Sequence, residues 1–292
     1  MVAEASYAHC LRLAQAHYEN FPVASRLLPR AARPHIAAIY AFARVADDFA
    51  DEGDRTIDER LSLLDDWARR LAAAAAGQVE ADGSDAAHIF TALAGTMRTC
   101  GLERRLFDDL LSAFRQDVTT TRYETWADVL DYCRRSADPI GRLVLRVSGY
   151  RDAHLDRLSD AVCTALQLTN FWQDIERDWA KGRVYVPREI MRASGADESD
   201  LARRRITDPW RAALTDASRR TRELFMTGRP IADAVSGRLR WELRATWLGG
   251  VRILDRLEAA HFDVFAHRPT LGRADLPAIA WHMLTWRQLP QS

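Results

Sequence analysis

Residues 40–52 read Tyr-Ala-Phe-Ala-Arg-Val-Ala-Asp-Asp-Phe-Ala-Asp-Glu, and this stretch is the starting point for the fold. Its apolar residues recur at three- and four-residue spacing, which indicates a helix. In a helix, Asp47 and Asp51 lie one turn apart on the same face. Their carboxylates repel each other, and the apolar neighbours add a desolvation cost, unless a cation or a basic partner offsets both. Taken alone, the stretch is more typical of a solvated acidic helix end.

A second acidic stretch, about 125 residues later, changes that interpretation. Residues 167–178 read Gln-Leu-Thr-Asn-Phe-Trp-Gln-Asp-Ile-Glu-Arg-Asp. Four-residue spacing aligns Asn170, Asp174 and Asp178 on one helical face. Oxygen ligands of this kind suit Mg²⁺, which accepts one or two carboxylates per ion and completes its shell with water and phosphate oxygens. We therefore expect two facing acidic helices to bind a diphosphate through Mg²⁺, which would make the diphosphate a good leaving group.

Helical spacing of apolar residues continues through most of the chain, and alternating strand patterns are nearly absent. The sequence therefore predicts an all-α protein. The segments 77–84 and 181–187 are the clearest breaks, but both are short for interdomain linkers, so residues 1–292 are predicted to form one domain. We expect helices at 4–18, 32–52, 56–76, 85–99, 103–117, 125–148, 153–180, 187–193, 197–203, 208–227, 230–260 and 274–287.

The overall composition excludes several classes of function. The 41 basic and 41 acidic residues cancel, so no nucleic-acid binding is indicated. The four cysteines are widely spaced and lack metal-ligand or disulfide patterns, which favours a reducing cytoplasm. No segment approaches the roughly 20 apolar residues of a spanning helix. Membrane contact would then be peripheral, at the inner face; the aromatic segment 280–286 could lie at a lipid interface, although core packing explains it equally well.

Basic and aromatic residues beside the acidic stretches could line an anion site. Tyr40, Arg44 and Asp48 follow one another at four-residue spacing, so Arg44 could contact a phosphate. A surface ion pair for Arg44 and a core position for Tyr40 are equally consistent with the sequence. The segment 181–187 is a glycine-interrupted basic turn with a short extended stretch. It could be a flap that excludes water from the site or an ordinary connector between helices.

Taken together, these motifs resemble those of the squalene and phytoene synthase family. The resemblance extends over nearly the whole chain, and it implies an all-α isoprenoid-synthase fold with a central cavity between two aspartate-rich helices. The segments that carry it are 40–44, 47–51, Asp117 with Arg122 and Tyr123, Tyr132 with Cys133, 167–170, 174–178 and 182–185.

The resemblance also implies roles for individual residues. Metal ligands, for Mg²⁺ as the cofactor, would be Asp47, Asp51, Asn170, Asp174 and Asp178. Catalytic residues would be Asp47, Asp48, Asp51, Asp174, Asp178 and Tyr132. Substrate contacts would be His17, Asn20, Tyr40, Arg44, Gln167, Asn170, Arg183, Tyr185 and Arg268.

Two segments depart from the general family pattern. Where many members carry His-Ser-x-Ser-Phe, residues 17–23 read His-Tyr-Glu-Asn-Phe-Pro-Val, and Glu19 would repel a second diphosphate. Where squalene synthases carry Val-Ala-Gly, residues 134–142 read Arg-Arg-Ser-Ala-Asp-Pro-Ile-Gly-Arg. A tyrosine common in the late helix is also missing near Gly250. Residues 19–23 and 136–142 resemble the hydroxysqualene synthase subgroup of hopanoid biosynthesis, which acts as a carbon–oxygen lyase on presqualene diphosphate.

That resemblance implies ionisation of presqualene diphosphate, rearrangement, and capture of the cation by water, without a nicotinamide cofactor. A presqualene diphosphate synthase and a hydroxysqualene reductase would be functional partners. His17, Glu19 and Asn20 are candidates for holding the water. Aromatic residues could line the cation chamber, although plain core packing is more typical of aromatics at helical spacing. The candidates are Phe42, Phe49, Phe171, Trp172 and Trp247.

Three alternatives remain open. A head-to-head prenyltransferase would make presqualene diphosphate, squalene or phytoene, but the hydroxyl-poor segment 17–25 argues against it. A non-catalytic helical subunit would have no need of two costly carboxylate clusters. A generic helical binding protein is the remaining alternative.

Overall fold

A computed structural model describes residues 2–16, 27–80 and 82–286, and every regular element in these ranges is helical. The one bridge between extended segments that we find in the described ranges joins Arg122 and Val184. The predicted all-α class is confirmed. His17, Glu19 and Asn20 lie outside the described residues.

The described chain forms two compact units. The first comprises 1–119 and 139–156, and the second comprises 120–138 and 157–292. One domain over 1–292 stays a prediction.

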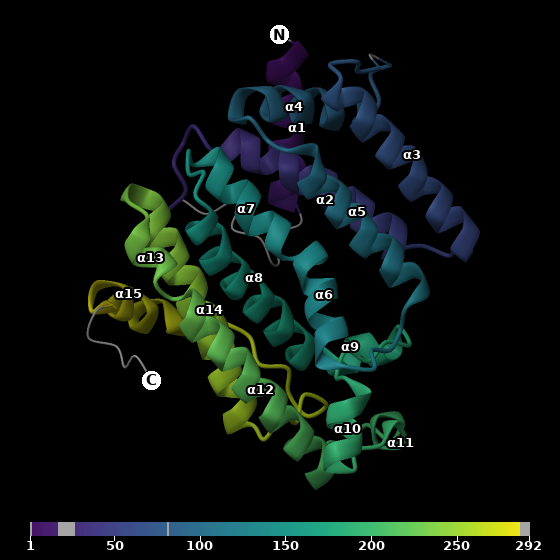
Figure 1. The fold of residues 1–292 in the computed structure, drawn as a ribbon, viewed down its shortest axis with the longest axis vertical. Coiled ribbons are helices and arrows are strands. Elements are labelled where there is room, and N and C mark those ends of the chain that lie inside the picture. The colour runs from purple at the N-terminus through teal and green to yellow at the C-terminus, as the bar shows by residue number, and fades with distance from the viewer. Residues whose placement is uncertain (1, 17–26, 81, 287–292) are drawn as a thin grey trace. The chain divides into compact units, whose positions relative to one another are not determined.

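In the first unit, α2 is the central helix. It packs against four other helices, α1, α3, α4 and α5 (Figure 1). The rings of Phe42, Trp67, Phe90 and Phe107 meet at their contacts, with centroids 4.5–6.0 Å apart. The helices of this unit are α1 (Val2–Ala16), α2 (Arg33–Asp51), α3 (Ile57–Ala75), α4 (Asp85–Cys100), α5 (Arg104–Thr119) and α7 (Asp138–Val147) from its second residue on.

In the second unit, α8 is the helix that leads to the second acidic stretch. A Cβ added at Gly228 would clash with Val162, and one at Gly250 would clash with Leu166, so α12 and α14 both approach α8 closely. This close approach leaves no space for a tyrosine at position 250. The elements are α6 (Trp126–Ser136), α8 (Ala153–Gln173) from Arg157 on, α9 (Ile175–Ala180), α10 (Arg188–Ser194), α11 (Glu198–Ala202), α12 (Asp208–Gly228), α13 (Ile231–Ala234), α14 (Gly237–Ala259), η2 (Arg273–Asp275) and α15 (Leu276–Leu284).

Three helices predicted as continuous are interrupted. The predicted helix 125–148 breaks at Ala137, shortly before Pro139, whose ring restricts the preceding backbone and whose nitrogen donates no hydrogen bond. The predicted helix 230–260 breaks at 235–236, where Gly237 adopts φ +62°, a conformation that glycine tolerates. The predicted helix 153–180 breaks at Asp174, within the acidic stretch.

Candidate active site

The first acidic stretch forms the C-terminal part of α2, and the helix is uninterrupted from Arg33 to Asp51. The side chains of Tyr40, Asp47 and Asp51 are half-buried. Ala46 and Ala50, which flank the carboxylates, are buried, with exposures of 0% and 4%. The carboxylates therefore lie at the border of an apolar core, where an added cation would gain more than in open water.

Arg44 and Asp48 form an ion pair within α2. The Arg44 Nη2 atom lies 2.6 Å from Asp48 Oδ1, and both side chains are about one-third exposed. This is the ion-pair interpretation of Arg44 that the sequence left open. It gives the carboxylate of Asp48 a compensating cation one turn away on the same helix.

Arg60, from the first turn of α3, holds the end of α2. Its Nη1 donates to the carbonyl oxygens of Ala50 at 2.8 Å, Phe49 at 3.2 Å and Glu52 at 3.2 Å, and its Nη2 donates to Gly53 at 2.8 Å. Helix C-termini carry partial negative charge, which the nearby carboxylates increase. Arg60 offsets that charge and fixes the helix end. Sequence reasoning missed it; the available signal was a cation in a helix's first turn, where acids are favoured.

The second acidic stretch is positioned by a break rather than by one continuous helix. Asp174 stands between α8 and α9 with φ −106° and ψ 16°. Hydrogen bonds of helical spacing nevertheless cross the break: the Asp174 amide donates to the Asn170 carbonyl, and the Asp178 amide donates to the Asp174 carbonyl, both at 2.8 Å. The four-residue register of Asn170, Asp174 and Asp178 is therefore preserved.

Arg268 forms a two-pronged ion pair with Asp174, and both were predicted site residues. The Nε atom donates to Oδ1 at 2.6 Å and the Nη2 atom to Oδ2 at 2.9 Å. The carboxylate and the guanidinium are 18% and 25% exposed. Arg177 adds a second cation, 3.6 Å from Oδ1. The structure thus brings together a predicted metal ligand and a predicted substrate contact that are 94 residues apart.

The segment that carries Arg268, residues 261–272, is tied to the acidic stretch at further points. The Gln173 side-chain amide donates to the Pro269 carbonyl. Arg204 pairs with Glu176 on α9 at 2.5 Å, and its guanidinium lies over the Phe265 ring at 5.3 Å. These contacts hold Arg268 against Asp174. Neither Gln173 nor Arg204 stood out in the sequence, because contacts between distant segments leave no spacing pattern.

Aromatic rings gather beside Asp178. The rings of Phe171 and Tyr185 stack at 3.7 Å with an interplanar angle of 4°, and Tyr132 contacts both, at 6.0 and 5.9 Å. Phe171 and Tyr185 also line a cavity of about 10 Å³ together with Asp178 and Arg183. The structure therefore brings three predicted site residues, Asp178, Arg183 and Tyr185, to one small cavity with an aromatic wall.

The segment 181–187 is held in place rather than standing free. Its Val184 amide donates to the Thr121 carbonyl at 3.0 Å, and next to the segment the Arg188 amide donates to Tyr123 at 2.9 Å. Val184, Tyr185 and Val186 are buried. These contacts favour the connector interpretation over a flap, because opening would break backbone bonds and expose apolar side chains.

Other candidates have the contacts of ordinary core residues. Phe42 is fully buried, and its carbonyl accepts a hydrogen bond from Trp67. Trp172 donates to Thr221 at 2.9 Å, and Trp247 donates to the Phe225 carbonyl at 2.7 Å. Gln167 and Asn170 are half-buried on α8.

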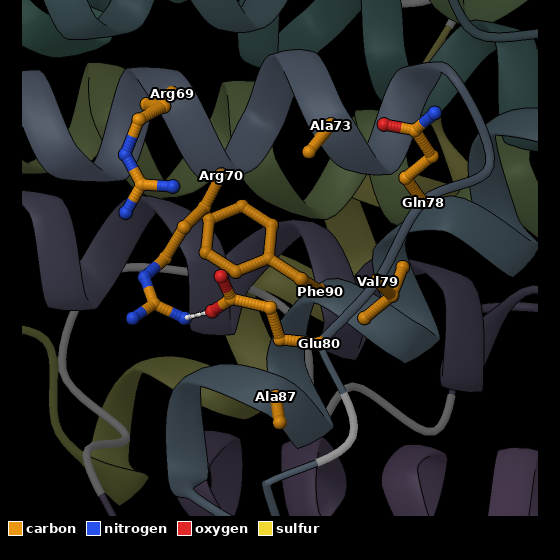
Figure 2. A pocket seen from close by; sticks show the side chains of 8 residues that line it. All are labelled: Arg69, Arg70, Ala73, Gln78, Val79, Glu80, Ala87 and Phe90. Atoms are coloured by element: carbon orange, nitrogen blue, oxygen red, sulfur yellow. Dashed lines mark hydrogen bonds and ion pairs between the residues drawn. The ribbon is translucent and has the colours of Figure 1, made fainter.

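Neither the cavity beside Asp178 nor a cavity in the first unit is large enough to be a substrate chamber by itself. A cavity in the first unit measures about 30 Å³ and is lined by none of the predicted site residues; Arg70 and Glu80 form an ion pair at its wall (Figure 2). Pockets for drug-sized ligands are commonly about 300–1,000 Å³. Among the described residues, no three His, Cys, Asp or Glu side chains gather closely enough to hold a metal ion.

Comparison with known proteins identifies the class of this chain. A family model described as squalene/phytoene synthase matches residues 14–275. The chain belongs to the squalene/phytoene synthase family and is an enzyme of that family.

Individual relatives lie within the same family. The hydroxysqualene synthase of Zymomonas mobilis is 40% identical over 210 residues, which cover 71% of this chain and 67% of that protein. The hydroxysqualene synthase of Rhodopseudomonas palustris is 40% identical over 73% of this chain and 70% of its own. The 15-cis-phytoene synthase of Synechococcus elongatus is 28% identical over 97% of this chain and 90% of its own.

Solved structures confirm the isoprenoid-synthase type of all-α fold. The squalene synthase HpnC of Alicyclobacillus acidocaldarius matches with a TM-score of 0.82 and 41% identity, covering 89% of this chain and 95% of that one. A dehydrosqualene synthase in complex with a ligand matches with a TM-score of 0.86 at 21% identity, over 98% of both chains, and this likeness concerns the fold alone.

Proposed function

We propose that this enzyme is a hydroxysqualene synthase that converts presqualene diphosphate and water into hydroxysqualene and diphosphate. The observation that carries the proposal is the 39–40% identity to three hydroxysqualene synthases. In this reaction the carbon–oxygen bond to diphosphate breaks and its electron pair leaves with the diphosphate. The cation rearranges, a water oxygen bonds to carbon, and the water loses a proton. The balance needs no reductant, and the enzyme is a carbon–oxygen lyase.

The metal ligands in this proposal are Asp47, Asp51, Asn170, Asp174 and Asp178. Their oxygen donors fit Mg²⁺, which needs only one or two carboxylates per ion and takes its other ligands from water and substrate. The Arg268 guanidinium beside Asp174 supports the fit, because this carboxylate already attracts a cation. When bound, Mg²⁺ supplies charge neutralisation that stabilises the leaving diphosphate. We propose that both acidic segments act on the same diphosphate.

Arginines and polar side chains complete the proposed diphosphate site. Arg268 would exchange its two hydrogen bonds with Asp174 for bonds to phosphate oxygens, since a guanidinium suits both partners. Arg44 and Arg183 would add positive charge. Tyr40, Gln167 and Asn170 would orient the substrate. Each of these roles binds or positions the leaving group before the bond breaks.

The aromatic group Tyr132, Phe171 and Tyr185 would face the cation that ionisation produces. Ring faces carry negative electrostatic potential and attract cations, more strongly where water is excluded. The parallel stack of Phe171 and Tyr185 supports this role, because a fixed ring surface costs little reorganisation when charge develops. His17, Glu19 and Asn20 remain the candidates for holding the attacking water.

The condensing alternative would join two prenyl diphosphates and is a transferase reaction. Similarity to phytoene synthases at 27–29% identity is lower than that to hydroxysqualene synthases. The catalytic proposal is favoured over a silent subunit because the acidic residues of both stretches are intact.

We propose that the enzyme works in the cytoplasm at the inner face of the membrane, between a presqualene diphosphate synthase and a hydroxysqualene reductase. All four cysteines are free thiols, which suits a reducing compartment. Of the helices within residues 2–16, 27–80 and 82–286, none is both long and apolar enough to cross a bilayer. Thirty-carbon substrates and products partition into lipid, so the reaction is expected to take place at a membrane surface.

The test is product identification. Purified enzyme with Mg²⁺ and no NADPH receives presqualene diphosphate in one reaction and farnesyl diphosphate in another, and the lipids are identified by mass. We expect hydroxysqualene from the first reaction and no condensation product from the second. Presqualene diphosphate from the second reaction would overturn the proposal in favour of a condensing enzyme.

A further inference from the structure

The outer face of α15 exposes a stripe of apolar side chains. Leu276, Trp281 and Leu284 are 61%, 63% and 70% exposed. Pro277 and Ala280 are exposed between them, so the stripe follows the three- and four-residue spacing of one helical face. Leu271, just before the helix, is 41% exposed. Large exposed hydrophobic residues in the described ranges are thus concentrated on this element.

The C-terminal end of α15 is held by several contacts, so the helix cannot rotate to bury the stripe without breaking them. Trp286 is 1% exposed, and the guanidinium groups of Arg229 and Arg244 lie 5.1 and 5.4 Å from its ring. Arg229 also donates to the Trp286 carbonyl at 2.7 Å, and Arg244 donates to the Met283 carbonyl at 3.0 Å. The buried side of the helix end is therefore fixed by cations that cap its carbonyls.

The N-terminal end of α15 is fixed by Asp275, whose side chain is buried. It accepts a hydrogen bond from the Gly272 amide at 2.7 Å and bonds at 2.5 Å from Arg252 and from Arg256. The hydrogen bond from the Gly272 amide is the largest influence that holds the pKa of this carboxyl below its usual range. The positive charges of Arg252 and Arg256 act in the same direction. With both ends tied to the unit, the apolar stripe is a stable surface and not a frayed tail.

We propose that the α15 stripe docks this enzyme on the surface of an anionic lipid bilayer. The five side chains of the stripe (Leu276, Pro277, Ala280, Trp281 and Leu284) offer no charge, and the Trp281 indole is of the kind that concentrates at lipid interfaces. At nine residues the helix is about 14 Å long, so it lies in the interface and does not span. The choice of lipid rests on the proposed function, whose substrate and product are thirty-carbon lipids.

Charge around the stripe favours an anionic surface. The segment 229–286 contains eight arginines against six Asp and Glu residues, a formal excess of two positive charges in a chain that is neutral as a whole. Several of these arginines already contact carboxylates or carbonyl groups within the unit, among them Arg229, Arg244, Arg252, Arg256 and Arg268. Arg273, three residues before the helix, is exposed. Cations beside an apolar helix face strengthen binding to anionic lipid.

A second copy of the chain fits this surface less well. Stable interfaces bury roughly 800 Å² on each partner and involve about 20–30 residues a side. The stripe offers three large side chains and a few small ones. Lipid needs no matching partner surface, so a narrow stripe is sufficient.

The experiment compares vesicle co-sedimentation of the wild-type enzyme with that of a Trp281→Ser/Leu284→Ser double variant, without substrate or Mg²⁺. One set of vesicles contains phosphatidylcholine alone, and the other also contains about 30 mol% phosphatidylglycerol, an anionic lipid. We expect the wild type to bind the anionic vesicles and the double variant to bind them at least about tenfold more weakly. Ile57→Ser, at an exposed apolar residue on α3 that is 56% exposed, is the matched control and should bind like the wild type.

Circular dichroism and turnover in detergent micelles, which should both be unchanged, show that the double variant is folded. Equal vesicle binding by wild type and double variant would overturn the proposal, as would a wild-type dimer that the double variant loses. If the wild type bound neutral and anionic vesicles equally well, the proposed preference for an anionic surface would be wrong. Vesicle binding is measured without turnover, so a chain that docks through α15 but makes no hydroxysqualene would refute the proposed function and leave this inference standing.

Discussion

The two acidic stretches share the four-residue spacing of their carboxylates but differ in backbone. The first lies on an uninterrupted helix that ends at Asp51. The second breaks at Asp174, although its hydrogen bonds keep helical spacing. Equal spacing in the sequence therefore does not imply equal local structure, because one residue can leave the helical conformation while the register around it survives.

The source of the compensating cation also differs. Asp48 pairs with Arg44, one turn away on the same helix, whereas Asp174 pairs with Arg268 from a segment 94 residues further along. The first arrangement forms with the helix itself. The second depends on tertiary structure, because its two residues come from distant segments. When ligands bind, Asp174 could therefore exchange Arg268 for a metal cation, and Arg268 could exchange Asp174 for a phosphate anion.

The largest effect is expected from neutralising one carboxylate in each stretch. Asp47→Asn and Asp174→Asn should each lower kcat/KM for diphosphate release by at least about 10²-fold, because an interaction with the leaving group's charge is lost. Steady-state assays of diphosphate release with saturating Mg²⁺ measure this. Normal turnover in either variant would refute the metal assignment for that stretch.

The two variants also differ in what they do to the ion pairs of their stretches. Asp174→Asn breaks the two-pronged pair with Arg268, whereas Asp47→Asn leaves the Arg44–Asp48 pair intact. Thermal unfolding should therefore show a lower midpoint for Asp174→Asn than for the wild type. Equal midpoints would mean that Arg268 contributes nothing to holding its segment.

Arg60→Ala should destabilise the first stretch. The guanidinium donates to four carbonyl groups at the end of α2, and its loss should lower the free energy of unfolding by about 1–2 kcal/mol. Denaturant unfolding measures the change. Arg55→Ala is the matched control, because Arg55 donates only to the exposed Glu52 carbonyl, and it should cost less than about 0.5 kcal/mol. Equal losses would contradict a special role for Arg60.

Arg268→Gln should give the smallest effect, and it should strengthen the binding of Mg²⁺ while weakening the binding of substrate. Removing the guanidinium leaves Asp174 with only the more distant Arg177, so Mg²⁺ should bind the substrate-free protein up to about fivefold more tightly, as calorimetry can measure. The KM for presqualene diphosphate should rise, because a phosphate contact is lost.

Arg268→Lys provides the control for that experiment, since it keeps the charge but loses the fork of two parallel hydrogen bonds. Its Mg²⁺ affinity and its KM should both fall between those of the wild type and Arg268→Gln. A KM increase with unchanged Mg²⁺ affinity would mean that the Arg268–Asp174 pair does not compete with the metal.

Much of the fold was predictable from periodicity. The helix expected at 32–52 is observed at Arg33–Asp51, and the one expected at 85–99 is observed at Asp85–Cys100. The breaks at Ala137 and Asp174 were missed because apolar spacing continues on both sides of each. The spacing of apolar residues indicates which helix face is buried. It does not indicate where a single residue departs from helical backbone angles.

For the candidate site, the residue types were predictable and their partners were not. Spacing selected Asp174 and family resemblance selected Arg268, but nothing in the sequence joined them. Arg60, Gln173 and Arg204 were missed for the same reason, because each acts on a carbonyl, ring or carboxylate supplied by another segment.

Residue types and their spacing along the chain were sufficient to predict the all-α class, the oxygen-donor chemistry of the acidic stretches and the family. Tertiary structure decided which cation meets Asp174, which side chain holds the end of α2, and that α15 turns Trp281 and Leu284 outward. Those features depend on contacts between segments far apart in the chain, and such contacts become specific only when the packed helices fix their distances.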